Sequence, residues 1–180
     1  MIMKPYAERM ARRGTEAAIE VLAQVKKLEA EGKSIVSFCI GEPDFDSPKP
    51  ILEAGIAALK DNQTHYTSNR GIIPLLEALS EHLENKYSIQ YDPKDEIVAT
   101  VGGSEALLLA IAALLDPGDE VILPSPCFVS YKGVVEISGG TAVEVPSTME
   151  NKFVPVPSEI EAAITPKTKA ILINFPTNPT

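Results

Sequence analysis

The residues whose types and spacing best suit chemistry lie at the junction VGGSEALLLA, residues 101–110. An expected strand leads into Gly102 and Gly103, which allow a ligand to approach the backbone closely. The helix that follows is expected to begin at Ser104, so its free amide groups and the positive end of its dipole would face that ligand. This pattern suits an anion such as phosphate. The alternative without a ligand is a tight turn with Ser104 as the helix cap.

Better-known phosphate and nucleophile motifs do not match this junction. It lacks the GxxxxGK[ST] pattern of nucleotide P-loops and the GxGxxG pattern of dinucleotide-binding folds. If the junction were a relaxed nucleophile elbow, Ser104 would need an Asp and then a His downstream. Both histidines, His65 and His82, lie upstream of it. A serine-hydrolase triad therefore cannot be completed within this sequence.

Other reactive side chains favour structural or solvated roles. Glu42, Asp44 and Asp46 could form a cation site, but alternating acids before Ser-Pro are more typical of a solvated turn. Cys39 and Cys127 belong to no CxxC motif and have no nearby His, so we expect reduced, structural thiols. We therefore expect no metal site.

Composition and charge narrow the class of protein. Of the 180 residues, 44% are hydrophobic and 23% are charged, close to the average for globular domains. The net charge of −9, without a long basic run, argues against nucleic-acid binding. The longest apolar run, residues 106–115, is about half of the ~20 residues needed to cross a bilayer, and the charged N-terminus is not typical of a signal peptide. We expect a cytoplasmic protein that binds neither nucleic acid nor membrane.

The elements that must position these residues alternate between helix and strand over the second half of the chain. Hydrophobic periodicity and turn residues predict helices at 15–31, 48–60, 73–87, 104–115, 128–137 and 158–164, and strands at 35–40, 97–101, 120–123, 141–145 and 169–175. This alternation predicts a largely parallel α/β sheet with helices on both faces.

Five segments occur in an order that resembles a known family. They are GEPDF at 41–45, HYT and SNRG within 65–71, VGGSEALLLA at 101–110, DPGDEVILPSPCFVSY at 116–131 and NFPTNPT at 174–180. Their order and spacing resemble the N-terminal half of the class I and II aminotransferases, which are fold-type I pyridoxal-phosphate enzymes. The resemblance extends over nearly the whole chain.

The resemblance implies a fold and a division into domains. The expected fold is a three-layer α/β large domain of the pyridoxal-phosphate-transferase type, with a mostly parallel sheet that is truncated in this chain. Residues 1–48 would form a helical N-terminal arm and a segment of the small domain. Residues 49–180 would form the first, incomplete part of the large cofactor-binding domain.

The resemblance also implies pyridoxal 5′-phosphate as the cofactor. In the family the glycine turn and helix start hold the 5′-phosphate, which points to Gly103 and Ser104 and agrees with the anion site. Phe128 matches the aromatic ring against the pyridine face, where many aspartate-type members carry Trp. Asn178 matches the asparagine that donates to the ring oxygen. Without the family, Phe128 is an ordinary buried residue and Asn178-Pro179 is a turn.

Three residues are implied in substrate binding and assembly. Gly41 matches a backbone contact to the substrate carboxylate, which Asn178 also helps to hold. Tyr66 matches a tyrosine that reaches across a homodimer to the partner's cofactor phosphate, so that each active site would be shared between two chains. Without the family, Tyr66 is a half-buried aromatic residue.

The implied reaction is transamination between an amino acid and a 2-oxo acid through a Schiff base. In the family the Schiff-base lysine and the arginine that holds the substrate carboxylate come well after the NPT motif, beyond Thr180. We therefore assign no catalytic residue here and expect an N-terminal fragment that is inactive alone. The alternatives are a β-lyase that eliminates across a C–S or C–N bond, and a non-enzymatic protein on the same scaffold.

Overall fold

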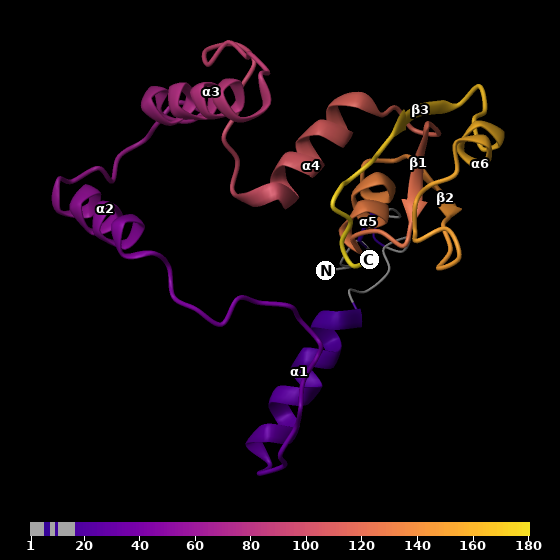
Figure 1. Ribbon diagram of the computed structural model, residues 1–180, viewed down its shortest axis with the longest axis horizontal. Coiled ribbons are helices and arrows are strands. Elements are labelled where there is room, and N and C mark those ends of the chain that lie inside the picture. The colour runs from indigo at the N-terminus through magenta and orange to yellow at the C-terminus, as the bar shows by residue number, and fades with distance from the viewer. Residues whose placement is uncertain (1–5, 8–9, 11–16) are drawn as a thin grey trace, which may run out of the picture. The chain divides into compact units, whose positions relative to one another are not determined.

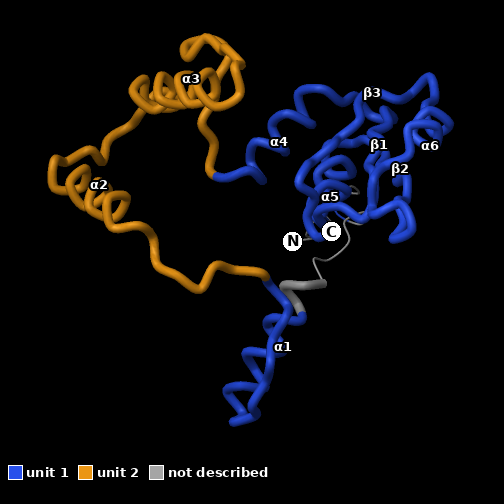
Figure 2. Tube along the Cα trace, in the orientation of Figure 1, with its two compact units in different colours: residues 1–40, 102–180 blue, residues 41–101 orange. Residues whose placement is uncertain are grey.

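The computed structural model describes residues 6–7, 10 and 17–180. The helices are α1 (Ala17–Ala30), α2 (Lys49–Lys60), α3 (Ile73–Tyr87), α4 (Gly102–Leu114), α5 (Ser130–Ile137) and α6 (Pro157–Ala162), and the strands are β1 (Glu120–Ser125), β2 (Thr141–Pro146) and β3 (Thr168–Ile171) (Figure 1). Contacts divide the chain into two compact units (Figure 2). Unit 1 comprises residues 1–40 and 102–180, and unit 2 comprises residues 41–101.

The sheet of unit 1 is parallel, with the strand order β2-β1-β3. The pairing of β1 with β2 runs without interruption from Glu120 opposite Thr141 to Ser125 opposite Pro146. The pairing of β1 with β3 shifts register just after Glu120. Parallel neighbours need crossover connections, and α5 and α6 lie in those connections. The predicted parallel α/β fold is therefore confirmed.

The core of unit 1 forms around β1. Val121, Ile122 and Leu123 are fully buried, as expected for the uninterrupted apolar run of a central parallel strand. The core cluster combines residues from α4, the residue after it, β1 and α5: Ile111, Leu115, Val121, Leu123, Tyr131 and Val135. The helices on either side of β1 in the sequence are thus fixed to it by apolar packing. Within the described residues, no helix has the length and apolar character needed to cross a bilayer.

Unit 2 is organised around the segment that precedes α3. The Arg70 guanidinium donates from Nη1 to the Lys94 carbonyl at 2.6 Å, and the Ala99 amide donates to the Arg70 carbonyl at 2.8 Å. Gly71 has a φ of +114°, and a Cβ there would lie 3.0 Å from Ala99 Cβ. A glycine therefore suits this close approach of two backbone segments. Leu76 of α3 is buried in the same unit.

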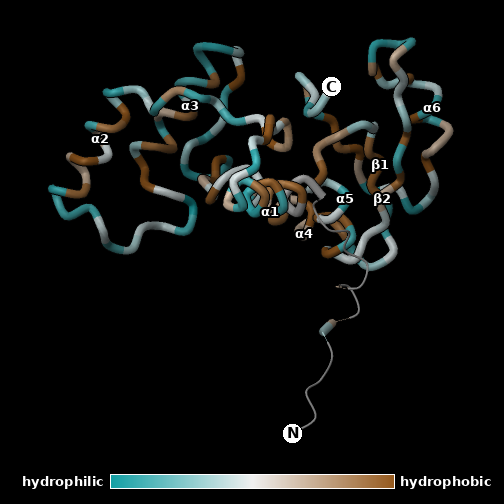
Figure 3. Tube along the Cα trace, turned by 90° about the horizontal axis from the view of Figure 1, so that it is seen from below, coloured by the Kyte–Doolittle hydropathy of each residue, from teal (hydrophilic) through white to brown (hydrophobic). Residues whose placement is uncertain are grey.

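Helix α2 exposes its apolar residues. Among the residues that the structure describes, none of its side chains is buried. The exposed ones are Ile51, Leu52, Ile56 and Leu59, and Figure 3 shows the apolar colour along this helix. A cluster of exposed apolar side chains on one helix is typical of a surface that another part of a protein or a partner covers.

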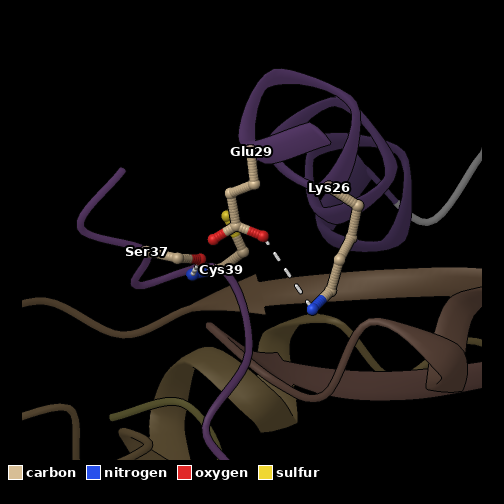
Figure 4. A network of polar contacts seen from close by, with 4 residues as sticks. All are labelled: Lys26, Glu29, Ser37 and Cys39. Carbon is tan, nitrogen blue, oxygen red and sulfur yellow. Dashed lines mark hydrogen bonds and ion pairs between the residues drawn. The ribbon is translucent and has the colours of Figure 1, made fainter. Parts of the chain in front are cut away.

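Helix α1 and the segment after it carry weak, exposed polar contacts (Figure 4). Lys26 and Glu29 lie one turn apart with 3.9 Å between Nζ and Oε2. The Cys39 amide donates to Ser37 Oγ over a long 3.5 Å. Exposed contacts of this kind contribute little to stability. Val25 of this helix is buried.

Several predicted elements differ from the structure. The strands predicted at 35–40 and 97–101 are wrong, because neither segment has a hydrogen-bonded strand partner in the described part of the chain. The helix predicted to begin at Ser104 begins at Gly102, so Ser104 lies inside its first turn and is not the N-cap. The helix predicted at 128–137 begins at Ser130, and the strand predicted at 169–175 ends at Ile171. Thr15 and Glu16, predicted as the start of α1, lie outside the described residues.

The close packing at Gly140 leads to a stability prediction. A Cβ there would lie 2.6 Å from Leu115 Cδ1 and 3.2 Å from both the Asp119 carbonyl oxygen and Val135 Cγ1. Gly140→Ala should therefore lower the free energy of unfolding by about 1–3 kcal/mol. Urea unfolding of the full-length protein measures this change.

The control for this prediction is Gly133→Ala, within α5. A Cβ at Gly133 meets nothing within 4 Å, and alanine favours the helix by about 0.5–1 kcal/mol. Gly133→Ala should thus leave the unfolding midpoint unchanged or raise it. A Gly140→Ala protein as stable as the wild type would contradict the packing described at this turn.

Candidate functional site

A small cavity lies at the carboxyl ends of β1 and β3. Its volume is about 20 Å³, enough for about one water molecule. Its lining includes Pro126, Cys127, Tyr131, Ser147, Asn174 and Asn178. In open α/β sheets, ligands bind outside the carboxyl ends of the strands. The cavity therefore marks the edge of the sheet where a ligand site is expected, and it brings Asn178 to the segment that follows β1.

Local hydrogen bonds shape the loop that carries Asn178. Asn174 Nδ2 donates to the Pro176 carbonyl at 3.1 Å. Thr177 Oγ1 donates to the Thr180 carbonyl and lies 3.1 Å from Thr180 Oγ1. These side-chain bonds to the backbone hold a segment that has left the sheet. Asn178 itself is exposed, so its amide is accessible to a ligand.

Phe128 is held by packing as well as by hydrogen bonding. Its half-buried ring packs against the core cluster and meets the Tyr131 ring edge to face, with 5.7 Å between centroids. The Tyr131 amide donates to the Phe128 carbonyl at 3.1 Å. The neighbouring Cys127 lines the cavity. The ring therefore has a fixed place close to the cavity.

The start of α4 offers an open backbone surface. Gly102 has a φ of +77°, and a Cβ at Gly102 or Gly103 would meet no atom within 4 Å. The backbone amides at the start of an α-helix generally lack acceptors within that helix, and Gly103 and Ser104 lie in the first turn of α4. One turn later, Leu107 packs against the cluster that also contacts Phe128. An anionic group can approach these amides directly.

Together these features of unit 1 fit a ligand with an anionic group and a planar, polar ring. Open amides at the start of α4 suit the anion, the Phe128 ring suits stacking, and the Asn178 amide can donate to a ring substituent. Pyridoxal phosphate has this combination of groups. The residues present therefore fit that cofactor in their chemistry.

The other two predicted site residues belong to unit 2. Gly41 is exposed, and a Cβ there would meet nothing within 4 Å. The Tyr66 side chain is fully exposed. Gly103, Ser104, Phe128 and Asn178, by contrast, all belong to unit 1. Four of the predicted residues thus lie in one unit, and the other two are exposed in the other unit.

Charge near the cavity comes from α5 and β2. Lys132 Nζ lies 2.7 Å from Glu144 Oε1, and this bond raises the pKa of Lys132. Burial raises the pKa of the Cys127 thiol, and the Glu144 carboxylate raises it further.

In the described residues, no three His, Cys, Asp or Glu side chains gather where they could hold a metal ion, and this includes the acids at 42, 44 and 46.

Sequence reasoning did not single out Ser147, which lines the cavity and donates twice to the backbone of β1. A serine after a proline at the end of a strand carries no recognisable signal. Its contact depends on the β1–β2 register, which the sequence does not display.

Comparisons with known proteins agree with one another. The family model for aminotransferase class I and II matches residues 33–180. The aspartate/prephenate aminotransferase of Thermus thermophilus is 42% identical over 178 residues, which cover 99% of this chain and 46% of that protein. The aromatic-amino-acid aminotransferase 2 of Thermococcus litoralis is 44% identical over 161 residues, which cover 88% of this chain and 41% of that protein.

A solved structure is similar over the same extent. The aspartate aminotransferase of Thermus thermophilus, determined with maleate, gives a TM-score of 0.94 at 42% identity. The similarity covers 99% of this chain and 46% of that one. The chain thus spans less than half the length of these relatives.

The environment of Cys127 predicts slow alkylation. Because its pKa is raised, less thiolate is present near pH 8 than in an exposed cysteine, and the thiolate is the reactive form. Glu144→Gln removes a negative charge that opposes ionisation, so it should lower this pKa and speed alkylation at pH 8. Mass spectrometry of the protein treated with iodoacetamide measures the rate.

The control for this prediction is Glu136→Gln on α5, because the pKa shift of Cys127 arises from burial and Glu144. That variant should alkylate at the wild-type rate. Equal rates for wild type and Glu144→Gln would contradict the influence of Glu144 on Cys127.

Proposed function

Since this chain belongs to the class I and II aminotransferase family, we propose that the full-length protein moves an amino group from an amino acid to a 2-oxo acid. The observation that carries the proposal is the family match over residues 33–180, together with a fold that agrees with a known aminotransferase at a TM-score of 0.94. The cofactor of this family is pyridoxal 5′-phosphate. The substrates are proposed to be small amino and oxo acids.

We propose that unit 1 holds the cofactor. The amides of Gly103 and Ser104, with the Ser104 hydroxyl, would bind the phosphate. Phe128 would lie against the pyridine ring, and Asn178 Nδ2 would donate to the ring oxygen. The chemistry that pyridoxal phosphate supplies when bound is withdrawal of electrons from the substrate α-carbon. What these four residues contribute is binding and orientation.

Substrate binding is proposed to involve Gly41 and Asn178. A main-chain amide at Gly41 can approach a carboxylate closely because no side chain intervenes. The open space around Gly41 supports this role. Asn178 is proposed to help to bind the substrate carboxylate through its side-chain amide. Binding through the carboxylate would leave the α-carbon free to react.

We also propose a division of the chain into domains. Residues 1–48 would form the N-terminal arm and part of the small domain, and residues 49–180 would form the first part of the large domain. The Schiff-base lysine would come from the protein beyond residue 180, so residues 1–180 alone would be inactive. A cytoplasmic location is proposed from the two free cysteines.

We propose a homodimer with shared active sites, and the support comes from exposed side chains in unit 2. Tyr66 is fully exposed, so its side chain is accessible to a partner. The apolar residues of α2 are exposed in the same unit and would be covered by a second copy. Tyr66 would then donate to the cofactor phosphate of the partner subunit.

The activity proposal predicts acceptor-dependent turnover. The full-length protein with pyridoxal phosphate and an amino acid such as glutamate or aspartate should form the donor's oxo acid only when a second 2-oxo acid is present. Chromatography of both products should give one new amino acid for each donor consumed. The same protein should show cofactor absorbance after dialysis.

Two other outcomes would contradict transamination. Ammonia and an oxo acid formed without an acceptor would indicate a β-lyase, and a full-length protein without cofactor absorbance would indicate a non-enzymatic role. Residues 1–180 serve as the control and should show no turnover. A borohydride-stable adduct at one specific lysine within these residues would contradict the proposed inactivity of this part alone.

The dimer proposal predicts complementation between two variants. Tyr66→Phe and Ser104→Ala should each weaken cofactor binding about tenfold, because each removes a hydrogen bond to a charged phosphate. If Tyr66 acts across the dimer, a hybrid of the two variants contains one intact site and one site with both changes. Mixed subunits should therefore bind cofactor at wild-type affinity in one site of each hybrid dimer.

Absorbance titration of the re-associated mixture distinguishes the two arrangements. Wild-type affinity at part of the sites supports sharing. Mass spectrometry must first show that subunits have exchanged. If every site then still binds the cofactor weakly, Tyr66 does not act on the partner's cofactor.

A further inference from the structure

Ser147 holds the carboxyl end of β1 from the neighbouring strand. Ser125 is the last residue of β1 and lies opposite Pro146, the last residue of β2, and the two strands run side by side in Figure 1. The Ser147 amide donates to the Ser125 carbonyl at 2.6 Å. Ser147 Oγ donates to the same oxygen at 2.7 Å. A carbonyl oxygen has two lone pairs, so both bonds can form together.

These two hydrogen bonds lie next to two prolines, which cannot donate from the backbone. Pro126 follows Ser125, and Pro146 precedes Ser147; neither proline has an amide hydrogen. The hydroxyl of Ser147 is partly buried, which shields the bond from competing water. Ser147 therefore fixes the carbonyl from which the chain leaves the sheet.

The segment that leaves the sheet at Ser125 reaches Phe128 three residues later. Its far end is fixed by Tyr131, whose amide donates to the Phe128 carbonyl and whose ring contacts the Phe128 ring. Between these two fixed points, Pro126 and Cys127 line the cavity. The place of the Phe128 ring thus depends on anchors at both ends of a short segment, and Ser147 supplies the anchor at the sheet.

We propose that Ser147 is a positioning residue for the cofactor ring. Its hydroxyl fixes the Ser125 carbonyl, and the segment that follows then presents Phe128 in one orientation to the pyridine ring. Ser147 acts through Phe128 and makes no contact with the cofactor. This role rests on the proposed function, which places Phe128 against that ring.

The test uses the full-length protein and Ser147→Ala, which removes the hydroxyl and leaves the amide bond. We expect pyridoxal phosphate to bind about three- to tenfold more weakly, the range that corresponds to one net hydrogen bond. The visible circular dichroism of the bound cofactor should also fall, because the ring is held less uniformly. In the apo protein, amide hydrogen exchange at Cys127 and Phe128 should become faster.

Two variants control this comparison. Ser147→Thr keeps the hydroxyl and should restore affinity and circular dichroism. Ser158→Ala makes the same chemical change at an exposed position of α6 and should have no effect. If Ser147→Ala does not fold, Ser147→Thr and Ser147→Val can be compared instead. Their side chains have nearly the same shape, and only threonine carries a hydroxyl.

A double-mutant cycle tests whether the effect passes through Phe128. In the Phe128→Ala background, Ser147→Ala should weaken cofactor binding no further, because the ring that it positions is gone. The same loss in both backgrounds would overturn the proposal, as would wild-type affinity and circular dichroism in Ser147→Ala.

The same cycle separates failure of this inference from failure of the proposed function. If Phe128→Ala weakens binding and Ser147→Ala does not, the role of Ser147 is wrong and the cofactor assignment stands. If Phe128→Ala leaves the affinity unchanged, Phe128 does not contact the ring, and the role of Ser147 is wrong with it. Thermal unfolding of the apo variants shows whether a change in affinity accompanies a loss of stability.

Discussion

The parallel pairing of β1 with a strand on each side is the constraint on which unit 1 depends. Parallel strands cannot be joined by tight turns, so the chain crosses back through α5 and α6 and all three carboxyl ends reach one edge of the sheet. The segments after β1, β2 and β3 therefore emerge together, and the cavity forms among them. Burial of the three apolar residues of β1 stabilises this arrangement.

The candidate cofactor residues are positioned by different kinds of interaction. Phe128 is held by packing against the core and Tyr131. Asn178 lies in a loop that contains local side-chain hydrogen bonds from Asn174 and Thr177 to the backbone. Ser104 is placed by a helix whose later turns pack on β1. A rigid sheet edge that carries loops with accessible polar groups is a common basis for binding sites.

The sequence predicted the elements that local patterns determine. The helix at 73–87 matches the structure residue for residue, because its stripe of leucines is a local property. The predictions of strands at 35–40 and 97–101 were wrong because a strand requires a partner. The local sequence of a segment does not show whether a distant segment pairs with it. The contact between Ser147 and Ser125 was missed for the same reason, since it depends on register. The candidate site residues came from the order of motifs, because an isolated Phe128 or Asn178 has no distinctive pattern.

The composition of β2 bears on how this protein behaves at high concentration. β2 lies at one edge of the described sheet, and the outer edge of a strand can pair with strands of other molecules and start aggregation. Glu144 places an exposed charge on that strand and is bonded to Lys132 of α5. Pro146 removes a donor at its end. The residue after β2, Ser147, anchors the end of β1. The strand itself is a poor template for pairing with the sheet of another molecule.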